Sequence, residues 1–216
     1  MRRIAWISAA AVIPLAALAT AAQAQLAGIP VYYSPRGGTG VGIAANLGFP
    51  NDSAGGGTAY GVSGSFGTGP VTLTAMVGAW KGTSFTSAQT TFGANIAYRL
   101  FGGGILPVAV AVQAGYGTVK SALPAPAPSN TINTIPVGVG ISFDPPLFPL
   151  KPWIAPRVDF ISGGGSSTSE VWVSGGVNFN LLLGLGVHAA VDYKPSSPSK
   201  MILGVGAHFD FHVPMM

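Results

Sequence analysis

The feature that most constrains this chain is a strict alternation of apolar residues with small or polar ones. In residues 201–213, MILGVGAHFDFHV, every second position is apolar from the first residue onward, and the intervening positions end in His208, Asp210 and His212. A period of two residues is the signature of a β-strand whose two faces differ. These faces therefore meet different surroundings, and the nature of those surroundings decides the fold.

The same period recurs in segments along the chain, and we expect strands at residues 39–49, 58–67, 70–80, 90–100, 105–118, 132–144, 151–161, 169–181, 185–193 and 200–213. One face is large and apolar, and the other is mostly Gly, Ala, Ser or Thr. Gly and Ala are poor β-formers, so something other than propensity selects them, and a lumen-lining interior is a sufficient reason. The pattern predicts an all-β fold, a closed antiparallel up-and-down transmembrane β-barrel of about ten strands, with eight as the alternative count.

Composition supports a membrane barrel over a soluble β-sandwich, which is the competing architecture. Only 7% of the residues are charged, against about 25% in a typical soluble domain. A soluble surface with so few charges would be poorly covered. The chain contains no cysteine, which excludes disulfides, a thiolate nucleophile and thiolate metal ligands.

The first 24 residues have the three parts of a signal peptide. Arg2 and Arg3 precede an apolar run that ends in the small-x-small sequence AQA. A membrane-anchor helix is the alternative, but the run is short for a span of about 20 residues and contains a proline. We expect cleavage before Gln25, which divides the chain into a signal peptide, residues 1–24, and an outer-membrane barrel domain, residues 25–216.

Removal of the signal peptide changes the charge and therefore the expected partners. Loss of the two arginines lowers the formal net charge from +4 to +2, so the basic character gives no reason to expect nucleic acid. Connections between the expected strands alternate between short or apolar turns and longer small-polar loops, and SGGGSSTSE, residues 162–170, is one of the expected loops. Short periplasmic turns and longer outside loops alternate in this way in outer-membrane barrels.

Aromatic residues on the apolar face form two groups near the strand ends. Near the outside rim we expect Phe49, Tyr60, Phe92, Tyr116, Phe160 and Tyr193. Near the periplasmic rim we expect Phe66, Tyr98, Phe143, Phe179, Phe209 and Phe211. Two aromatic bands around an aliphatic belt are typical of lipid interfaces, so the predicted partner of this face is outer-membrane lipid.

Taken together, the signal peptide, the alternating segments, the two kinds of turn and the C-terminal GVGAHFDFHV resemble the small bacterial outer-membrane β-barrel proteins of the OmpA and OmpW type. The resemblance covers essentially the whole mature chain and implies an architecture more than an activity. It also implies the barrel insertion machinery as a partner, which reads a terminal aromatic residue in this family. Phe209 and Phe211 have suitable spacing for that signal, although residues 212–216 follow them.

Charged residues that face the lumen by parity are Arg99, Arg157, Asp159, Glu170, Asp192 and Asp210. A charge costs less there than on the lipid face, where Arg costs about 2–4 kcal/mol at the midplane. We expect Arg157 to be the centre of a network with its acidic neighbours. The network is either a satisfied interior structure or a selectivity filter.

His188, His208 and His212 form a second inward-facing group. His-x-His on a strand can chelate zinc, but inward polar groups near a rim also bond to one another and to water. We expect no metal, no cofactor and no catalytic residue, because no Ser and His are placed for acyl transfer. A lipid-modifying enzyme at the rim is therefore the least favoured hypothesis.

The small lumen residues predict the leading function. Ten strands lined by Gly and Ala should leave a narrow water-filled or ligand-sized space. A non-enzymatic narrow pore, or a barrel for small-solute passage or binding, is the first hypothesis. The alternative is a structural or adhesive envelope protein with a plugged lumen and interacting outside loops.

Overall fold

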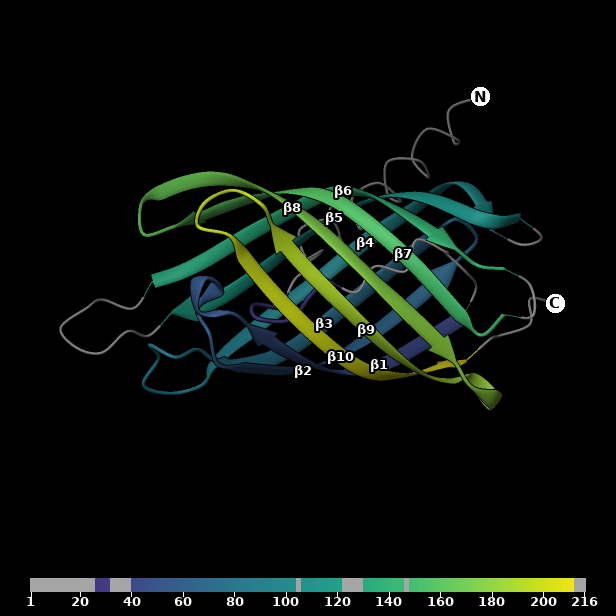
Figure 1. The fold of residues 1–216 in the computed structure, drawn as a ribbon, viewed down its shortest axis with the longest axis horizontal. Helices are drawn as coiled ribbons and strands as arrows, with labels where there is room; N and C mark the ends of the chain where they lie inside the picture. Colours follow the sequence, from purple (N-terminus) through teal and green to yellow (C-terminus); the bar gives the residue numbers. More distant parts are fainter. Residues whose placement is uncertain (1–25, 32–39, 104–105, 122–129, 146–147, 212–216) are drawn as a thin grey trace, which may run out of the picture.

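The computed structural model describes residues 26–31, 40–103, 106–121, 130–145 and 148–211. Its strands are β1 (Gly40–Pro50), β2 (Thr58–Thr68), β3 (Val71–Lys81), β4 (Gln89–Gly103), β5 (Leu106–Ser121), β6 (Asn130–Phe143), β7 (Leu150–Gly163), β8 (Ser166–Asn180), β9 (Leu185–Lys194) and β10 (Lys200–Phe211). Each strand pairs antiparallel with its neighbours in sequence, and β1 pairs with β10 to close the barrel (Figure 1). The predicted closed up-and-down barrel is confirmed, with ten strands rather than eight.

The register of the β1–β10 ladder shows which residues of the alternating pattern face inward and which face outward. Ala44 lies opposite His208, and Leu47 lies opposite Val205, on the β1–β10 ladder. Leu47 and Val205 are exposed on the outer face, whereas the intervening Asn46 is buried. The same parity holds around the barrel, so most large apolar side chains of the strands point outward, whereas Trp153, Trp172 and Ile202 are buried inside. Among the described residues, no helix is long and apolar enough to cross a membrane.

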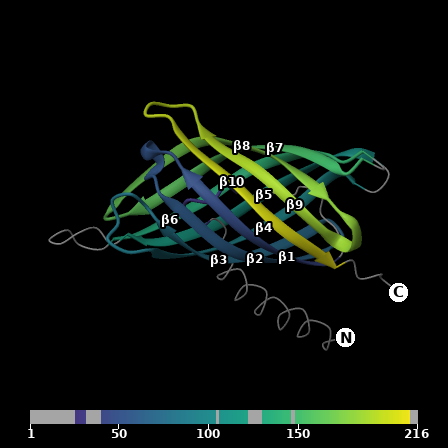
Figure 2. The same cartoon turned by 60° about the horizontal axis from the view of Figure 1, so that its bottom comes forward.

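The two ends of the barrel differ in their connections (Figure 2). The described connections at one end, called the loop end, are residues 51–57, 82–88, 164–165 and 195–199. At the opposite end, called the turn end, β1 begins and β10 ends, and residues 69–70 and 181–184 connect strands. Two short 3-10 helices complete the described elements, η1 (Asp52–Ala54) at the loop end and η2 (Leu182–Gly184) at the turn end.

One expected loop is wrong. Residues 162–170 do not form a loop, because β7 continues to Gly163 and β8 begins at Ser166. Gly164 and Gly165 alone make the reversal, with φ angles of 60° and 82°. Two successive residues with positive φ form the type of turn that matches the twist of paired strands. The polar composition of this stretch therefore belongs to strand ends that extend beyond the apolar belt.

The expected aromatic girdle residues all occupy outward-facing positions. The exposed ones are Phe49, Tyr60, Phe66, Phe92, Tyr98, Phe143, Phe160, Phe179, Tyr193 and Phe211. Tyr116 is half-buried and donates a hydrogen bond to Asn133 on the neighbouring strand. Phe209 is also half-buried and packs edge-on against Phe211, with ring centroids 4.3 Å apart.

Replacing Gly165 with Ala tests how much stability the β7–β8 turn loses when a residue with a side chain has to adopt a positive φ. An added Cβ would meet no atom within 4 Å, so the cost arises only from the positive φ of 82°. We expect the free energy of unfolding to fall by about 1 kcal/mol, measured by urea unfolding of the refolded barrel in lipid vesicles. Gly64→Ala is the matched control, because its Cβ also meets open space and its φ is not positive. An equal loss in both variants would contradict the turn assignment.

Candidate functional site

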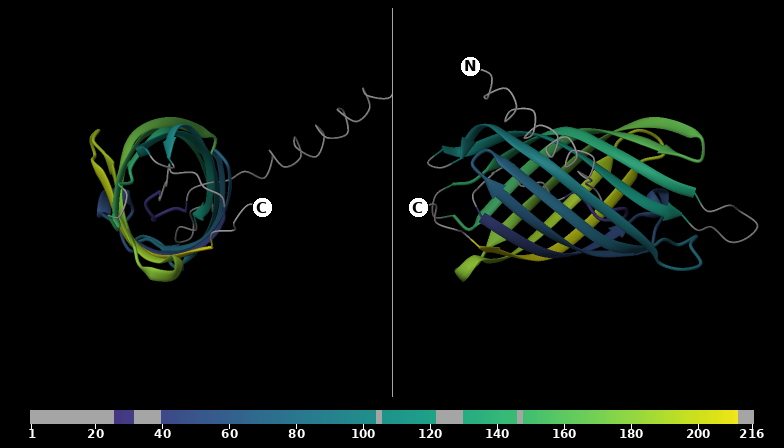
Figure 3. Two further views of the ribbon diagram at one scale, coloured as in Figure 1. Left: turned by 90° about the vertical axis from the view of Figure 1, so that its right-hand side faces the viewer. Right: turned by 180° about the vertical axis from the view of Figure 1, so that it is seen from behind.

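Part of the lumen is occupied by the chain itself. Residues 26–31 lie inside the ring of strands, where Figure 3 shows them as a purple segment. Leu26, Ile29 and Val31 are 2–3% exposed. The Leu26 carbonyl accepts a hydrogen bond from the Ile29 amide at 3.2 Å, and Gly28 has a φ of 79°, as the third residue of a tight turn often requires. Residues 26–31 therefore occupy part of the space that the sequence predicts to be water-filled or ligand-sized.

Glycines in the barrel wall make room for this segment. A Cβ at Gly48 would overlap the Gly28 carbonyl oxygen, and one at Gly61 would overlap the Leu26 side chain. Leu26 and Ile29 also form a buried cluster with Ala59, against which Trp80 packs. Gly48, Gly61 and Ala59 thus form a cradle for residues 26–31.

Two wall side chains satisfy backbone groups of the segment. The Ala27 amide donates to Thr91 Oγ1 at 3.0 Å, and the Val31 amide donates to Asp192 Oδ2 at 3.2 Å. Thr91 and Asp192 are both 0% exposed. Because a buried amide outside a ladder needs another acceptor, these bonds hold the segment at two defined points of the wall.

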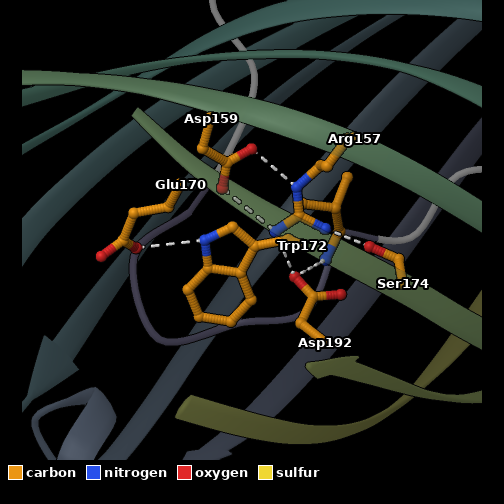
Figure 4. A network of polar contacts seen from close by, with 7 residues as sticks. Arg157, Asp159, Glu170, Trp172, Ser174 and Asp192 are labelled. Carbon is orange, nitrogen blue, oxygen red and sulfur yellow. Dashed lines mark hydrogen bonds and ion pairs between the residues drawn. The ribbon is translucent and has the colours of Figure 1, made fainter. Parts of the chain in front are cut away.

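Arg157 lies at the centre of a buried polar network beside this segment (Figure 4). Its Nε is 2.8 Å from Asp159 Oδ1, and its Nη2 is 2.8 Å from Asp192 Oδ2. Nη1 donates to Ser174, and the guanidinium carbon lies 5.5 Å from the centre of the Trp172 ring. Asp192 therefore joins the arginine on β7 to the Val31 amide in the lumen.

Lysines extend the network toward the loop end. Glu170 Oε1 is 2.7 Å from Lys200 Nζ and 3.5 Å from Lys194 Nζ, while its Oε2 accepts from the Trp172 indole at 3.2 Å. Asp159 lies directly opposite Glu170 on the β7–β8 ladder, and Lys194 lies opposite Lys200 on the β9–β10 ladder. Like charges opposite one another are destabilising, and the pairs of Glu170 with Lys194 and Lys200 offset that repulsion.

The remaining predicted lumen charges lie elsewhere. Arg99 is near the turn end, where its Nη2 donates to the Gly69 carbonyl at 3.4 Å. Asp210 is also near the turn end, and its side chain is 45% exposed. The structure thus gathers Arg157, Asp159, Glu170 and Asp192 in one layer and leaves Arg99 and Asp210 outside it.

Two histidines meet in the turn-end half of the lumen. The Nδ1 atoms of His188 and His208 are 3.1 Å apart, and His188 Nε2 is 2.8 Å from Asn46 Oδ1. His208 Nε2 lies 3.8 Å from Asp210 Oδ2. His212 lies outside the described residues. Within the described ranges, no group of three or more His, Asp or Glu residues is arranged to hold a metal ion.

A small cavity of about 180 Å³ lies above residues 26–31 toward the loop end. Its lining includes Ala27, Asp159, Glu170, Trp172 and Lys200. At about 30 Å³ for each water in the liquid, it has room for about six water molecules. The charged groups that line it are engaged in the ion pairs already described.

Several members of this site could not be singled out from the sequence. Lys194 and Lys200 have the appearance of solvated charges at strand ends, and Thr91 and Ser174 are ordinary small polar positions. Residues 26–31, LAGIPV, are too few to show a period. The one available signal is the series of wall glycines, which indicates that something occupies the space beside them.

A closed antiparallel barrel with outward apolar side chains and inward charged groups has the features of an outer-membrane β-barrel. No family model and no curated protein sequence matches the chain, but solved structures do. The β-domain of the Bordetella autotransporter BrkA is 13% identical, with 80% of this chain and 100% of that one covered and a TM-score of 0.54. This likeness shows the fold alone.

Two other solved barrels are similar at lower scores. The N-terminal barrel domain of Pseudomonas aeruginosa OprF is 14% identical, covers 81% of this chain and 99% of its own, and has a TM-score of 0.44. The translocator domain of the Neisseria meningitidis autotransporter NalP is 14% identical, with 82% and 90% covered and a TM-score of 0.47. The closed ten-strand ladder and the BrkA likeness give this chain the fold of a small outer-membrane β-barrel.

Replacing Arg157 with Met tests the energetic weight of the network. The change leaves the carboxylates of Asp159 and Asp192 buried without their cation, and removing one partner of a buried pair costs about 3–5 kcal/mol. We expect a loss of that size in the free energy of unfolding, measured in urea. Lys151→Met is the control, because the Lys151–Asp144 pair is partly exposed and should contribute about 0–1 kcal/mol. Equally small losses in both variants would show that the network adds no stability.

Proposed function

We propose that this chain is an exported outer-membrane protein whose barrel is closed at rest by its own residues 26–31. The barrel fold, the exposed apolar belt and the signal-peptide pattern support the location. The role is non-enzymatic and needs no cofactor. Its partners are the lipid around the belt and the insertion machinery that reads the C-terminal strand.

The burial of residues 26–31 in the lumen is the observation that carries this proposal. The segment fits a cradle of wall glycines and bonds to Thr91 and Asp192. A solute that crossed the barrel at this level would have to displace the segment. It would also pass the buried Arg157 ion pairs, which are costly to break because each charge would lose its partner.

Of the two leading functions that the sequence predicts, closure favours a structural or adhesive envelope protein. The described loop-end connections are small and polar, as in residues 51–57 and 82–88. They are the surface through which such a protein would contact partners outside the cell. A narrow pore remains the second candidate, and it requires residues 26–31 to leave the lumen.

Ion conductance separates the two candidates. The mature barrel, first shown to be folded by heat-modifiable migration, is expected to give no steady conductance steps in a planar bilayer. Gly28→Val should displace residues 26–31 and open the lumen. A φ of 79° is unfavourable for a β-branched residue, and the Cβ of the valine would lie 2.9 Å from atoms of Ala59 and Trp80. We expect discrete steps from this variant.

Gly64→Val is the matched control, since it adds the same side chain at a position that faces open space. It should remain as silent as the parent. Steady steps from the unaltered barrel, equal to those of Gly28→Val, would contradict closure and restore the pore as the leading function. Silence from all three proteins would show that residues 26–31 are not what closes the lumen.

A further inference from the structure

The turn between β8 and β9 exposes leucines to an unusual degree. Leu182 is 84% exposed and Leu183 is 89% exposed. The other exposed large apolar side chains of the described chain, including those on the membrane-facing belt, are between 36% and 59% exposed. These leucines, together with Leu181, are called the leucine turn below. A turn at this position in an aqueous compartment would favour polar residues.

The backbone of the leucine turn is held in an unfavourable form. Leu183 has φ 60° and ψ 29°, and it is the one non-glycine residue with positive φ in the described ranges. Bulky residues are rare in this region, where Gly or Asn is far easier to accommodate. The next residue, Gly184, fits so closely that a Cβ there would overlap the Asp210 carbonyl oxygen of β10. The turn is therefore fixed against β10, with its leucines directed away from the wall.

The leucine turn is continuous with the membrane-facing surface. Leu185 lies opposite Phe209 on the β9–β10 ladder, and Phe179 and Phe211 are exposed nearby on the same outward face. Viewed along the barrel axis in Figure 3, the yellow-green β8–β9 turn lies outside the outline of the wall. Its leucines thus extend the apolar belt sideways from the rim rather than closing the lumen.

We propose that the leucine turn inserts into the hydrocarbon boundary of the membrane leaflet at the turn end and anchors the barrel there. This inference rests on the proposed membrane location. A lipid is the occupant because the sequence Leu-Leu-Leu-Gly offers no polar or charged side chain with which a protein partner could be selected. Hydrocarbon needs no such group, since its interaction with leucine is non-directional and proportional to the apolar area buried.

Spin labelling tests the depth of the leucine turn. The chain has no cysteine, so Leu182→Cys and Leu183→Cys each place one nitroxide label in the mature barrel, folded in phosphatidylcholine–phosphatidylethanolamine vesicles. Collisions with oxygen, which concentrates in hydrocarbon, are compared with collisions with a water-soluble nickel chelate. We expect both labels to favour oxygen.

Two control labels distinguish a failure of the proposed anchor from a failure of the proposed membrane location. Leu203→Cys reports the membrane-facing centre of β10, where Leu203 is 47% exposed, and Ser87→Cys reports the polar loop end. Labels at 182 and 183 that match Ser87→Cys while Leu203→Cys favours oxygen would overturn the anchor alone. A Leu203→Cys label that favours nickel would overturn the membrane location itself.

A second variant tests whether the Leu183 side chain contributes to the insertion. Asn tolerates the left-handed conformation, so Leu183→Asn keeps the turn while removing an apolar side chain. With the label at position 182, we expect this change to lower the oxygen preference and raise the nickel collisions. An unchanged depth would overturn the anchoring role of Leu183, because the labelled turn would then reach the same position without it.

Discussion

The constraint on which the rest of this structure depends is that backbone amides and carbonyls inside a membrane have no water to bond to. Strands satisfy them only by pairing on both sides, so the sheet has to close on itself. The β1–β10 ladder performs this closure, from Val41 opposite Phe211 to Pro50 opposite Ile202. Closure then separates two environments, and the alternation of side chains follows from it.

The enclosed interior is the second feature on which the structure depends, because the small side chains of the wall leave space that other groups can occupy. In this barrel, residues 26–31 and the Arg157 layer occupy much of the loop-end half and leave a cavity of about 180 Å³. The two fillings are linked, since Asp192 accepts from the Val31 amide and from Arg157. The interior is thus stabilised both by packing and by electrostatic interactions, because its buried charges pair with partners on different strands.

The two ends of the barrel differ in the polarity of their exposed connections. The loop end carries small polar connections and the glycine reversal at residues 164–165, which let the strands extend beyond the apolar belt. The turn end carries exposed leucines in a fixed turn beside the girdle residues Phe209 and Phe211. With the membrane location and the anchor proposed above, polar loops at one end and exposed leucines at the other would give the barrel a defined direction in a bilayer.

The sequence by itself determined the strands, their inward and outward faces and the inward position of Arg157, because side-chain alternation is a local property of the chain. It could not show that Glu170 on β8 pairs with Lys200 on β10, since these strands are not neighbours and only the curvature of the closed barrel brings them together. It likewise could not place residues 26–31, which have no period of their own. Their burial was decided by the tertiary structure, through the room that the wall glycines leave inside the closed barrel.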